Sequence, residues 1–260
     1  MAKLKTAIIG CSHIAKTAHL PGYQAASDLC DVQYFVDTRR EAAEALRDAY
    51  GRGEVRTDYR DLLSDPNLDC VSVCTPNSLH APISIDFLSA GKHVLCEKPA
   101  ANSAPIAREM QRAADAAGRI LNIGVCMRYN TAVEKVRGMI QSGALGEIYH
   151  IYCSFRAHRA IPGLGGPFTR KALSGGGVLI DWGVHYLDLI DYCLDGLQVR
   201  TVSASAYSKL GNPIAGYVCK DMWAGPRRED GVCDVEDCVT ALIRTAGPSI
   251  SLNGAWAQNI

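Results

Sequence analysis

The sequence lacks features that mark several classes of protein. It contains no run of 18 or more apolar residues, so no transmembrane helix is expected. It carries no net charge, because 27 Lys and Arg balance 27 Asp and Glu, which argues against a general binder of nucleic acid or anionic membranes. The first residues, Met1 to Lys5, lack the apolar stretch and cleavage site of a signal peptide, so we expect a cytoplasmic location.

Cysteine is abundant, but the pairing motifs are missing. The chain has 11 cysteines, an odd number, and no C-x-x-C motif. Most of them lie inside apolar runs, where a free cysteine behaves as a small buried hydrophobe. We therefore predict reduced structural thiols and keep a metal or redox site as the alternative.

The first half of the chain alternates between apolar runs and helical patterns. Such alternation predicts a parallel, doubly wound sheet, and 48% apolar residues are ample for its core. Helices are predicted over Arg40–Tyr50, closed by Gly51, and over Ala104–Ala117, closed by Gly118. We place the end of this N-terminal domain at residue 124. The predicted strands are Leu4–Ile9, Val32–Val36, Asp69–Cys74, Lys92–Cys96 and Ile120–Val125.

In the second half, residues 125–260, predicted helices and strands no longer alternate regularly. An amphipathic helix over Thr131–Gln141 precedes a strand over Glu147–Arg156, and a longer helix follows from about Gly176 to Leu194. The remaining strand patterns lack intervening helices, which predicts an α+β domain with an open, mostly antiparallel sheet. These patterns cover Val199–Ser208, Val235–Thr245 and Ser249–Ala257.

A degenerate glycine turn follows the first predicted strand. Its sequence, Gly10-Cys11-Ser12-His13-Ile14-Ala15, keeps the first glycine of G-x-G-x-x-G and has Ala at the third position. A strand, a tight turn and a helix are the context that a dinucleotide-binding fingerprint requires. Serine at the second position is the weak point, because its Cβ crowds the pyrophosphate, although its hydroxyl can donate a hydrogen bond.

Asp37 ends the second predicted strand, at the place where an acidic residue binds the ribose 2′-hydroxyl of NAD. Arg39 and Arg40 follow at once, and an arginine there can accommodate the 2′-phosphate of NADP. Asp37 thus favours NAD and leaves NADP possible. The alternative is that Asp37 is only a helix N-cap.

Two further segments end strands. Thr75-Pro76-Asn77 turns the chain after one strand, with His80 in the first turn of the next helix. Glu97-Lys98-Pro99 follows another strand, and ligands of open α/β sheets bind outside the carboxyl ends of strands. Lys98 could therefore meet a bound substrate, and the alternative is a solvated strand end.

A second reactive cluster follows Gly175-Gly176-Gly177. Asp181 and His185 are four residues apart on one predicted helix face, and Asp188 continues the stripe. A carboxylate beside a histidine orients its tautomer and raises its basicity, which suits removal of a proton from an alcohol. A helical ion pair with a buried histidine and a zinc site formed by these three residues are the alternatives.

Taken in order, these motifs resemble the Gfo/Idh/MocA family, the glucose–fructose oxidoreductase and inositol dehydrogenase group, over essentially the whole chain. The resemblance implies a Rossmann domain that binds NAD, with NADP as the alternative, and a C-terminal α/β domain with a large, mostly antiparallel sheet. It implies that Lys98, Asp181 and His185 are catalytic and that Met127 and Arg128 contact substrate. The residues that it places at the cofactor are Gly10, Cys11, Ser12, His13, Ile14, Asp37, Thr38, Arg39, Thr75, Pro76, Asn77, His80, Glu97 and Lys98.

The expected function is hydride transfer between nicotinamide and a secondary alcohol or ketone of a sugar, inositol or related polyol. A non-catalytic NAD(P)-binding regulator or sensor is the alternative, and no resident metal is expected. Family members often oligomerise through the open sheet face, so a homo-oligomer, dimer or tetramer, is expected. The chain ends at Ile260, soon after its last predicted strand, so the C-terminal domain is expected to be short relative to the family.

Overall fold

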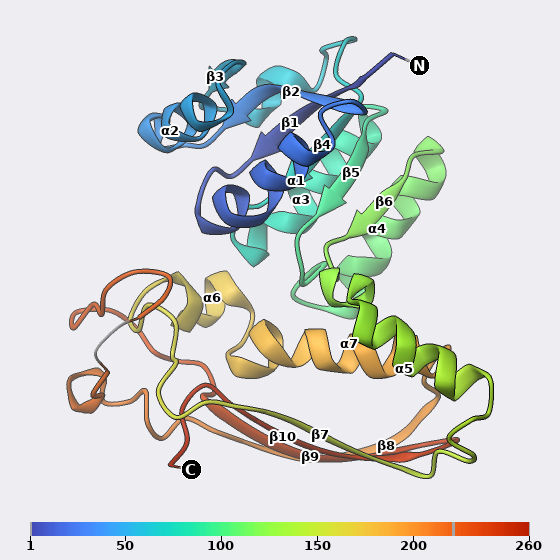
Figure 1. The fold of residues 1–260 in the computed structure, drawn as a ribbon. Helices are drawn as coiled ribbons and strands as arrows, with labels where there is room; N and C mark the ends of the chain where they lie inside the picture. Colours follow the sequence, from blue (N-terminus) through green and yellow to red (C-terminus); the bar gives the residue numbers. More distant parts are fainter. Residues whose placement is uncertain (1, 220–221, 260) are drawn as a thin grey trace. The chain divides into compact units, whose positions relative to one another are not determined.

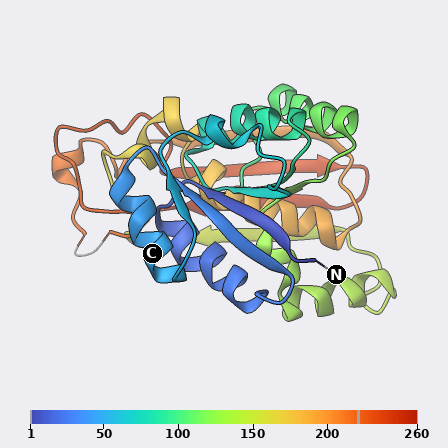
Figure 2. The ribbon, with the colours of Figure 1, turned by 90° about the horizontal axis from the view of Figure 1, so that it is seen from above.

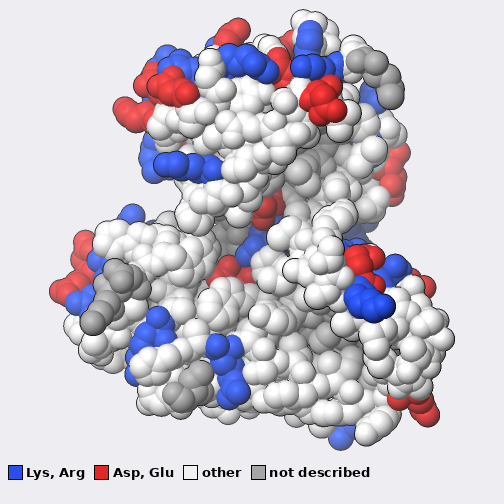
Figure 3. All heavy atoms as spheres, in the orientation of Figure 1, with Lys and Arg blue, Asp and Glu red and all other residues white. Residues whose placement is uncertain are grey.

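The computed structural model describes residues 2–219 and 222–259, which divide into two compact units, residues 1–124 and 125–260. Each unit is described by itself. Among the helices in the described part of the chain, none combines the length and the apolar character needed to span a bilayer. On the face shown in Figure 3, side chains of both signs occur on each unit.

The N-terminal unit is a six-stranded parallel sheet in the order β3-β2-β1-β4-β5-β6, the order of the doubly wound dinucleotide-binding fold (Figure 1). The predicted fold class is confirmed. Sequence reasoning missed β3, a three-residue edge strand paired with β2. The strands are β1 (Leu4–Ile9), β2 (Cys30–Val36), β3 (Glu54–Arg56), β4 (Cys70–Val73), β5 (His93–Cys96) and β6 (Leu121–Ile123).

Helices cover both faces of this sheet (Figures 1 and 2). Consecutive residues of β1 point to opposite faces, because side chains alternate along a strand. Ala7 and Ile9 belong to the core under α3 and α4, whereas Ile8 packs with residues of α1 and α2. The helices are α1 (Leu20–Ala25), α2 (Arg40–Tyr50), α3 (Asn77–Ser89) and α4 (Ala104–Ala117), with 3₁₀ helix η2 (Tyr59–Leu62) and π-helix η1 (Ala15–His19).

The C-terminal unit contains a four-stranded sheet in the order β7-β10-β9-β8. The pairs β8–β9 and β9–β10 are antiparallel, as the sequence predicts, but β10 runs parallel to β7. The sheet is therefore mixed. The parallel partner of β10 is β7, which lies about a hundred residues earlier in the chain. The strands are β7 (His150–Arg156), β8 (Val199–Tyr207), β9 (Cys238–Thr245) and β10 (Ser249–Ala255).

One face of this second sheet is covered by helix. Phe155 and Leu252 are buried in the same core as Tyr186 and Leu187 of α7, and the Phe155 and Tyr186 rings stack at 4.9 Å. All nine residues of the edge strand β8 are exposed. The helices of this unit are α5 (Thr131–Gln141), α6 (Lys171–Ser174) and α7 (Val184–Cys193), with π-helix η5 (Leu179–Gly183) and 3₁₀ helices η3 (Cys126–Tyr129), η4 (Pro167–Thr169) and η6 (Ile214–Gly216).

Candidate active site

The glycine turn joins β1 to a helix that begins at His13, as the sequence predicts. Gly10 has a φ of +91°, and a Cβ placed there would lie 2.6 Å from the carbonyl oxygen of Cys74 in the neighbouring strand connection. Only glycine meets both conditions without strain. The first amides of the helix have no partner within it, because a helix leaves its first N–H groups unpaired. A tight turn followed by a helix N-terminus fits a phosphate group.

Arg39 connects Asp37 to Ser12 of this turn by hydrogen bonds to both. The Asp37 carboxylate accepts hydrogen bonds from the backbone amides of Cys11 and Arg39, both at 2.9 Å. The Arg39 guanidinium, which is 65% exposed, donates to the Ser12 hydroxyl at 2.8 Å. The Ser12 hydroxyl is therefore bonded to the arginine that follows Asp37. Asp37 and the cation of Arg39 are presented together at the carboxyl end of β2.

His80 lies inside the unit rather than on its surface. The residue is 1% exposed, and its ring nitrogens lie 2.7 Å from the carbonyl oxygen of Pro99 and 2.8 Å from that of Thr75. Two carbonyl acceptors favour the doubly protonated ring, whereas burial, the largest influence, lowers the pKa of His80. A neutral ring serves one carbonyl and a protonated ring serves both. His80 thus lies between the carbonyl groups of two predicted site segments, Thr75-Pro76-Asn77 and Glu97-Lys98-Pro99.

Glu97 is also held from within the unit. Its Oε1 lies 2.9 Å from Nε2 of His19, the last residue of η1, and its Oε2 accepts the backbone amide of Lys98 at 3.1 Å. Burial works to raise the pKa of Glu97, but the hydrogen bond and charge of His19, the Lys98 amide and the Lys98 charge together hold it below its usual range. The half-buried Lys98 follows β5 at the carboxyl edge of the sheet, where the sequence predicts it.

In the C-terminal unit, two of the three consecutive glycines occupy positions that other residues do not fit. Gly175 ends α6 with a φ of +84°. A Cβ at Gly177 would lie 1.8 Å from the backbone oxygen of Glu236. The Glu236 carboxylate in turn accepts the amides of Gly177 at 2.9 Å and Leu179 at 3.1 Å. Glu236 therefore caps the start of the helix that carries Asp181 and His185, and a negative charge there stabilises the helix dipole.

Gly177→Ala is expected to lower the free energy of unfolding by about 3 kcal/mol or more, because the new methyl group must displace backbone rather than a flexible side chain. Gly138→Ala in α5 is the matched control, since nothing lies within 4 Å of a Cβ there. We expect that control to keep or slightly raise stability, because Ala favours a helix interior over Gly. Urea unfolding followed by circular dichroism measures both variants. Equal midpoints for the two would contradict the proposed close approach.

Asp181 lies in the π-helical segment η5, and His185 lies just beyond it in α7. Asp181 is 7% exposed and accepts a hydrogen bond at 3.1 Å from the indole Nε1 of Trp256, which is itself 1% exposed. His185 is half-buried. The sequence predicts a regular α-helix here, whereas the structure has a wider, π-helical turn over Leu179–Gly183. Such π-bulges occur frequently at functional sites.

Asp188 and Arg128 form a pair that sequence reasoning did not anticipate. The Arg128 guanidinium binds the Asp188 carboxylate through Nε at 2.8 Å and through Nη2 at 2.5 Å, and lies over the Tyr192 ring. Asp188 is therefore bonded to η3 instead of joining Asp181 and His185 in a ligand set. These contacts hold Arg128 against α7, whereas Met127 is 37% exposed. Within residues 2–219 and 222–259, no group of three or more His, Cys, Asp or Glu could hold a metal ion.

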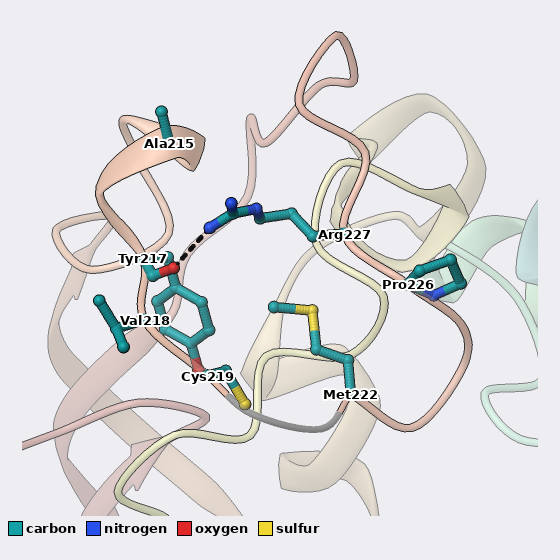
Figure 4. Close-up of a pocket in the computed structure, with 7 residues that line it drawn as sticks. All are labelled: Ala215, Tyr217, Val218, Cys219, Met222, Pro226 and Arg227. Atoms are coloured by element: carbon teal, nitrogen blue, oxygen red, sulfur yellow. Dashed lines mark hydrogen bonds between the residues drawn. The ribbon is translucent and has the colours of Figure 1, made fainter.

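The loop that follows β8 is held by Asp237. This residue is 2% exposed, and its Oδ2 accepts the amides of Lys209, Leu210 and Gly211. Further along the loop, a cavity of about 550 Å³ is lined by seven residues, among which the Arg227 guanidinium donates to the Tyr217 carbonyl (Figure 4). None of the predicted site residues lines this cavity, so it is not the candidate site. Its lining comprises Ala215, Tyr217, Val218, Cys219, Met222, Pro226 and Arg227.

Sequence reasoning missed three residues that contact the predicted site residues. His19, Glu236 and Trp256 each contact a predicted residue or segment from a distant part of the chain. The His19–Glu97 and Asp181–Trp256 pairs are separated by 78 and 75 residues. No local pattern indicates such a contact, and the local signal was the adjacent acidic pair Glu236-Asp237 inside the predicted strand Val235–Thr245.

Both units match family models. Residues 4–125 match the model described as an oxidoreductase family with an NAD-binding Rossmann fold, and residues 133–259 match the GFO/IDH/MocA C-terminal domain. The chain therefore belongs to the Gfo/Idh/MocA oxidoreductase family, and its N-terminal unit is an NAD-binding Rossmann domain. The residues present fit that cofactor: the Gly10 turn can receive a phosphate, and the buried Thr75 hydroxyl has no hydrogen-bond partner among the described residues.

Named relatives act on sugars. The chain is 37% identical to D-glucoside 3-dehydrogenase of Escherichia coli over 208 residues, which are 80% of this chain and 59% of that protein. It is 32% identical to 1,5-anhydro-D-fructose reductase of Ensifer adhaerens over 204 residues, 78% of this chain and 60% of that protein. The crystal structure of GenD2 from gentamicin A biosynthesis, in complex with NAD, matches 100% of this chain and 68% of its own with 25% identity and a TM-score of 0.82. The chain thus spans about three fifths of the length of the two curated relatives.

Proposed function

We propose that this chain belongs to an NAD-dependent oxidoreductase that interconverts a secondary alcohol and a ketone on a sugar or related polyol. The observation that carries the proposal is the tight Gly10 turn, which leads directly into a helix N-terminus that can receive a phosphate, in a chain that places Lys98 at the carboxyl edge of the same sheet. The sugar names of two relatives support the substrate class. We take glucosides as the first class to test, because the D-glucoside dehydrogenase is 37% identical over 80% of this chain.

We propose separate roles for three side chains. The bound nicotinamide accepts or supplies the hydride. His185 takes the proton from the substrate hydroxyl during oxidation and returns it during reduction. Lys98 stabilises the negative charge that develops on that oxygen, as a cation positioned in advance does. Asp181, with one carboxylate oxygen bonded to Trp256, orients His185 or binds a neighbouring hydroxyl.

We propose that the cofactor lies along the carboxyl edge of the N-terminal sheet. The helix N-terminus that follows the Gly10 turn receives the pyrophosphate, and Asp37 and Arg39 meet the adenosine ribose. The contacts of His80, Glu97 and Arg128 within their units support positioning roles for these three, and Met127 remains a substrate contact in the proposal. The proposed cofactor contacts are Gly10, Cys11, Ser12, His13, Ile14, Asp37, Thr38, Arg39, Thr75, Pro76, Asn77 and Lys98.

We also propose a homo-oligomer in the cytoplasm. The exposed large apolar residues of the C-terminal unit, among them Tyr152 at 64% and Val202 at 59%, support association through its sheet. All 11 cysteines are free thiols, which suits a reducing compartment. Size-exclusion chromatography with light scattering measures the assembly, and a monomer across the micromolar range would contradict it.

Titration with NADH and NADPH, followed by nicotinamide fluorescence, tests the cofactor. Asp37 accepts two backbone amides and faces the ribose edge, so we expect NADH to bind at least about fivefold more tightly than NADPH, a difference of about 1 kcal/mol. Tighter binding of NADPH would show that the Arg39 cation has more influence on the choice of cofactor than the Asp37 carboxylate. Absence of binding to the folded protein would contradict the proposed function.

Oxidation of methyl α-D-glucoside with NAD, followed by absorbance of the NADH formed, tests the reaction. Turnover that stops in a Lys98→Met variant is the expected result. NADH binding without turnover on glucosides, anhydro sugars or inositols would favour the non-catalytic regulator or sensor, which no feature of the described residues supports over the enzyme.

A further inference from the structure

We propose that Ser12, the residue that departs from the glycine fingerprint, positions the Arg39 guanidinium to receive a 2′-phosphate on the adenosine ribose. Ser12 is thus a specificity-determining residue that acts through Arg39 and sets how well the chain accepts NADP as well as NAD. This role rests on the proposed function, because it takes the cofactor's adenosine to lie between the Gly10 turn and Asp37. All of the residues concerned belong to the N-terminal unit.

The structure distinguishes the two arginines that follow Asp37. The Arg40 side chain turns along α2, where its Nε donates to Glu44 at 3.0 Å. The Arg39 side chain crosses to the glycine turn, where its Nη2 donates to the Ser12 hydroxyl at 2.8 Å. Of the two arginines, Arg39 is therefore the one that lies at the proposed cofactor edge.

Both ends of Arg39 are held. Its backbone amide donates to Oδ1 of Asp37 at 2.9 Å, and its carbonyl accepts the amide of Ala42 in the first turn of α2 at 3.0 Å. At the far end of the side chain, Nε lies 3.4 Å from the same Asp37 oxygen, and Nη2 is bonded to Ser12. The guanidinium therefore lies between the end of β2 and the glycine turn, which are the places that this fold uses for the ribose and the pyrophosphate.

The donors that remain on Arg39 suit a phosphate. A guanidinium has five N–H groups, and two of them serve Asp37 and Ser12. The other three, two on Nη1 and one on Nη2, have no hydrogen-bond partner within residues 2–219 and 222–259. Bidentate binding of a phosphate uses one N–H from each terminal nitrogen, so the contacts with Asp37 and Ser12 leave that geometry available.

The two charges at this edge differ in their exposure. The Asp37 side chain is 9% exposed, and its oxygens accept the backbone amides of Arg39 and Cys11. The Arg39 side chain is 65% exposed. A 2′-phosphate that approaches from solvent thus meets the cation first, and the same cation offsets part of the repulsion between the phosphate and the carboxylate.

Ser12 supplies the short contact that orders the guanidinium. Without it, the side chain of Arg39 keeps the contact of Nε with Asp37, which at 3.4 Å is long for a hydrogen bond, and it can adopt other rotamers. A long side chain that must be ordered when its ligand binds lowers the affinity, whereas the hydroxyl orders it in advance. An adenosine without a 2′-phosphate does not bind this guanidinium bidentately, so its affinity depends little on Ser12.

Affinities for adenosine 2′,5′-bisphosphate and adenosine 5′-monophosphate, measured by isothermal titration calorimetry, test this role without nicotinamide or turnover. The ratio of the two affinities, the 2′-phosphate preference, cancels effects on the part of the site that both ligands share. In Ser12→Ala we expect this preference to fall about fivefold, with affinity for the monophosphate within about twofold of the original protein. In Ser12→Thr, which keeps the hydroxyl, we expect the preference to stay within about twofold.

A double-mutant cycle tests whether Ser12 acts through Arg39. Arg39→Met is expected to lower the 2′-phosphate preference about thirtyfold, because a charged bidentate contact is lost. Addition of Ser12→Ala to that variant should change the preference by less than about twofold, since no guanidinium remains to be ordered. Arg40→Met is the matched control, which removes the same charge one residue further on and should leave the preference within about twofold.

Four results would overturn this role. They are an unchanged preference in Ser12→Ala, a preference that rises because Ser12 keeps the guanidinium away from the phosphate, an equal loss of affinity for both ligands, and equal losses of preference in Arg39→Met and Arg40→Met. Failure of the original protein to bind either adenosine phosphate would also overturn it.

The proposed function is tested separately. Glucoside oxidation by the original protein, together with an unchanged 2′-phosphate preference in Ser12→Ala, would support the oxidoreductase and overturn the role of Ser12. The expected preferences in a protein that oxidises no glucoside, anhydro sugar or inositol would support the role of Ser12 and contradict the enzyme.

Discussion

Lys98→Met is expected to reduce turnover by about 10²- to 10³-fold and to leave NADH binding within about twofold of the original protein. Methionine keeps the length of the side chain and removes its charge. The reduction follows because the developing oxyanion loses its cation, whereas the Gly10 turn and the Asp37 edge, which carry the proposed cofactor contacts, are unaltered. Initial rates with methyl α-D-glucoside and NAD, together with NADH fluorescence titration, measure the two quantities.

Lys5→Met is the matched control for this variant. Lys5 lies on β1 of the same unit, where its Nζ contacts Asn67 at the surface. The same charge is removed there without a proposed role, so we expect turnover and binding like those of the original protein. A Lys98→Met protein that turns over normally, or that loses NADH binding while its residual turnover is unchanged, would contradict the role assigned to Lys98.

Gly10→Ala is expected to abolish measurable NADH binding and to lower the free energy of unfolding by about 3 kcal/mol. Two costs add at this position. A φ of +91° is strained for any residue with a Cβ, and that Cβ would lie 2.6 Å from the carbonyl oxygen of Cys74. Relief requires β1 and the end of β4 to separate, which moves the helix amides that we propose for the pyrophosphate. Urea unfolding and NADH titration measure both effects.

Gly22→Ala tests the same substitution where neither cost applies. Gly22 lies in α1, and nothing lies within 4 Å of a Cβ placed there. We expect unchanged NADH binding and stability raised by up to about 1 kcal/mol, because Ala is the better helix former. Full NADH binding by Gly10→Ala would show that the turn is not the phosphate site.

Glycine stop signals made several helices predictable to the residue. The predicted helices Arg40–Tyr50 and Ala104–Ala117 are confirmed, with Gly51 and Gly118 in the left-handed conformation directly after them. The helix Thr131–Gln141 is also confirmed. By contrast, the strand Glu54–Arg56 has three residues and pairs at the sheet edge, too short for an alternating pattern to indicate it.

The candidate site was predictable where its residues directly follow predicted strands. The residues Gly10, Asp37 and Lys98 lie at the carboxyl ends of parallel strands, so their placement along one sheet edge follows from the strand pattern. The partners that hold them do not follow, since Arg39 reaches across to Ser12 and His19 reaches Glu97 through the fold. The roles of these residues in binding and reaction remain predictions.

By itself the sequence determined the alternation of strands and helices, the closing glycines and the order of the motifs, because periodicity and turn chemistry act over a few residues. Only the tertiary structure decided that β10 runs parallel to β7, that Asp188 binds Arg128 and that Trp256 holds Asp181. Each of these contacts joins segments 60 or more residues apart. Such pairs depend on how the whole core packs, and a local sequence pattern does not indicate them.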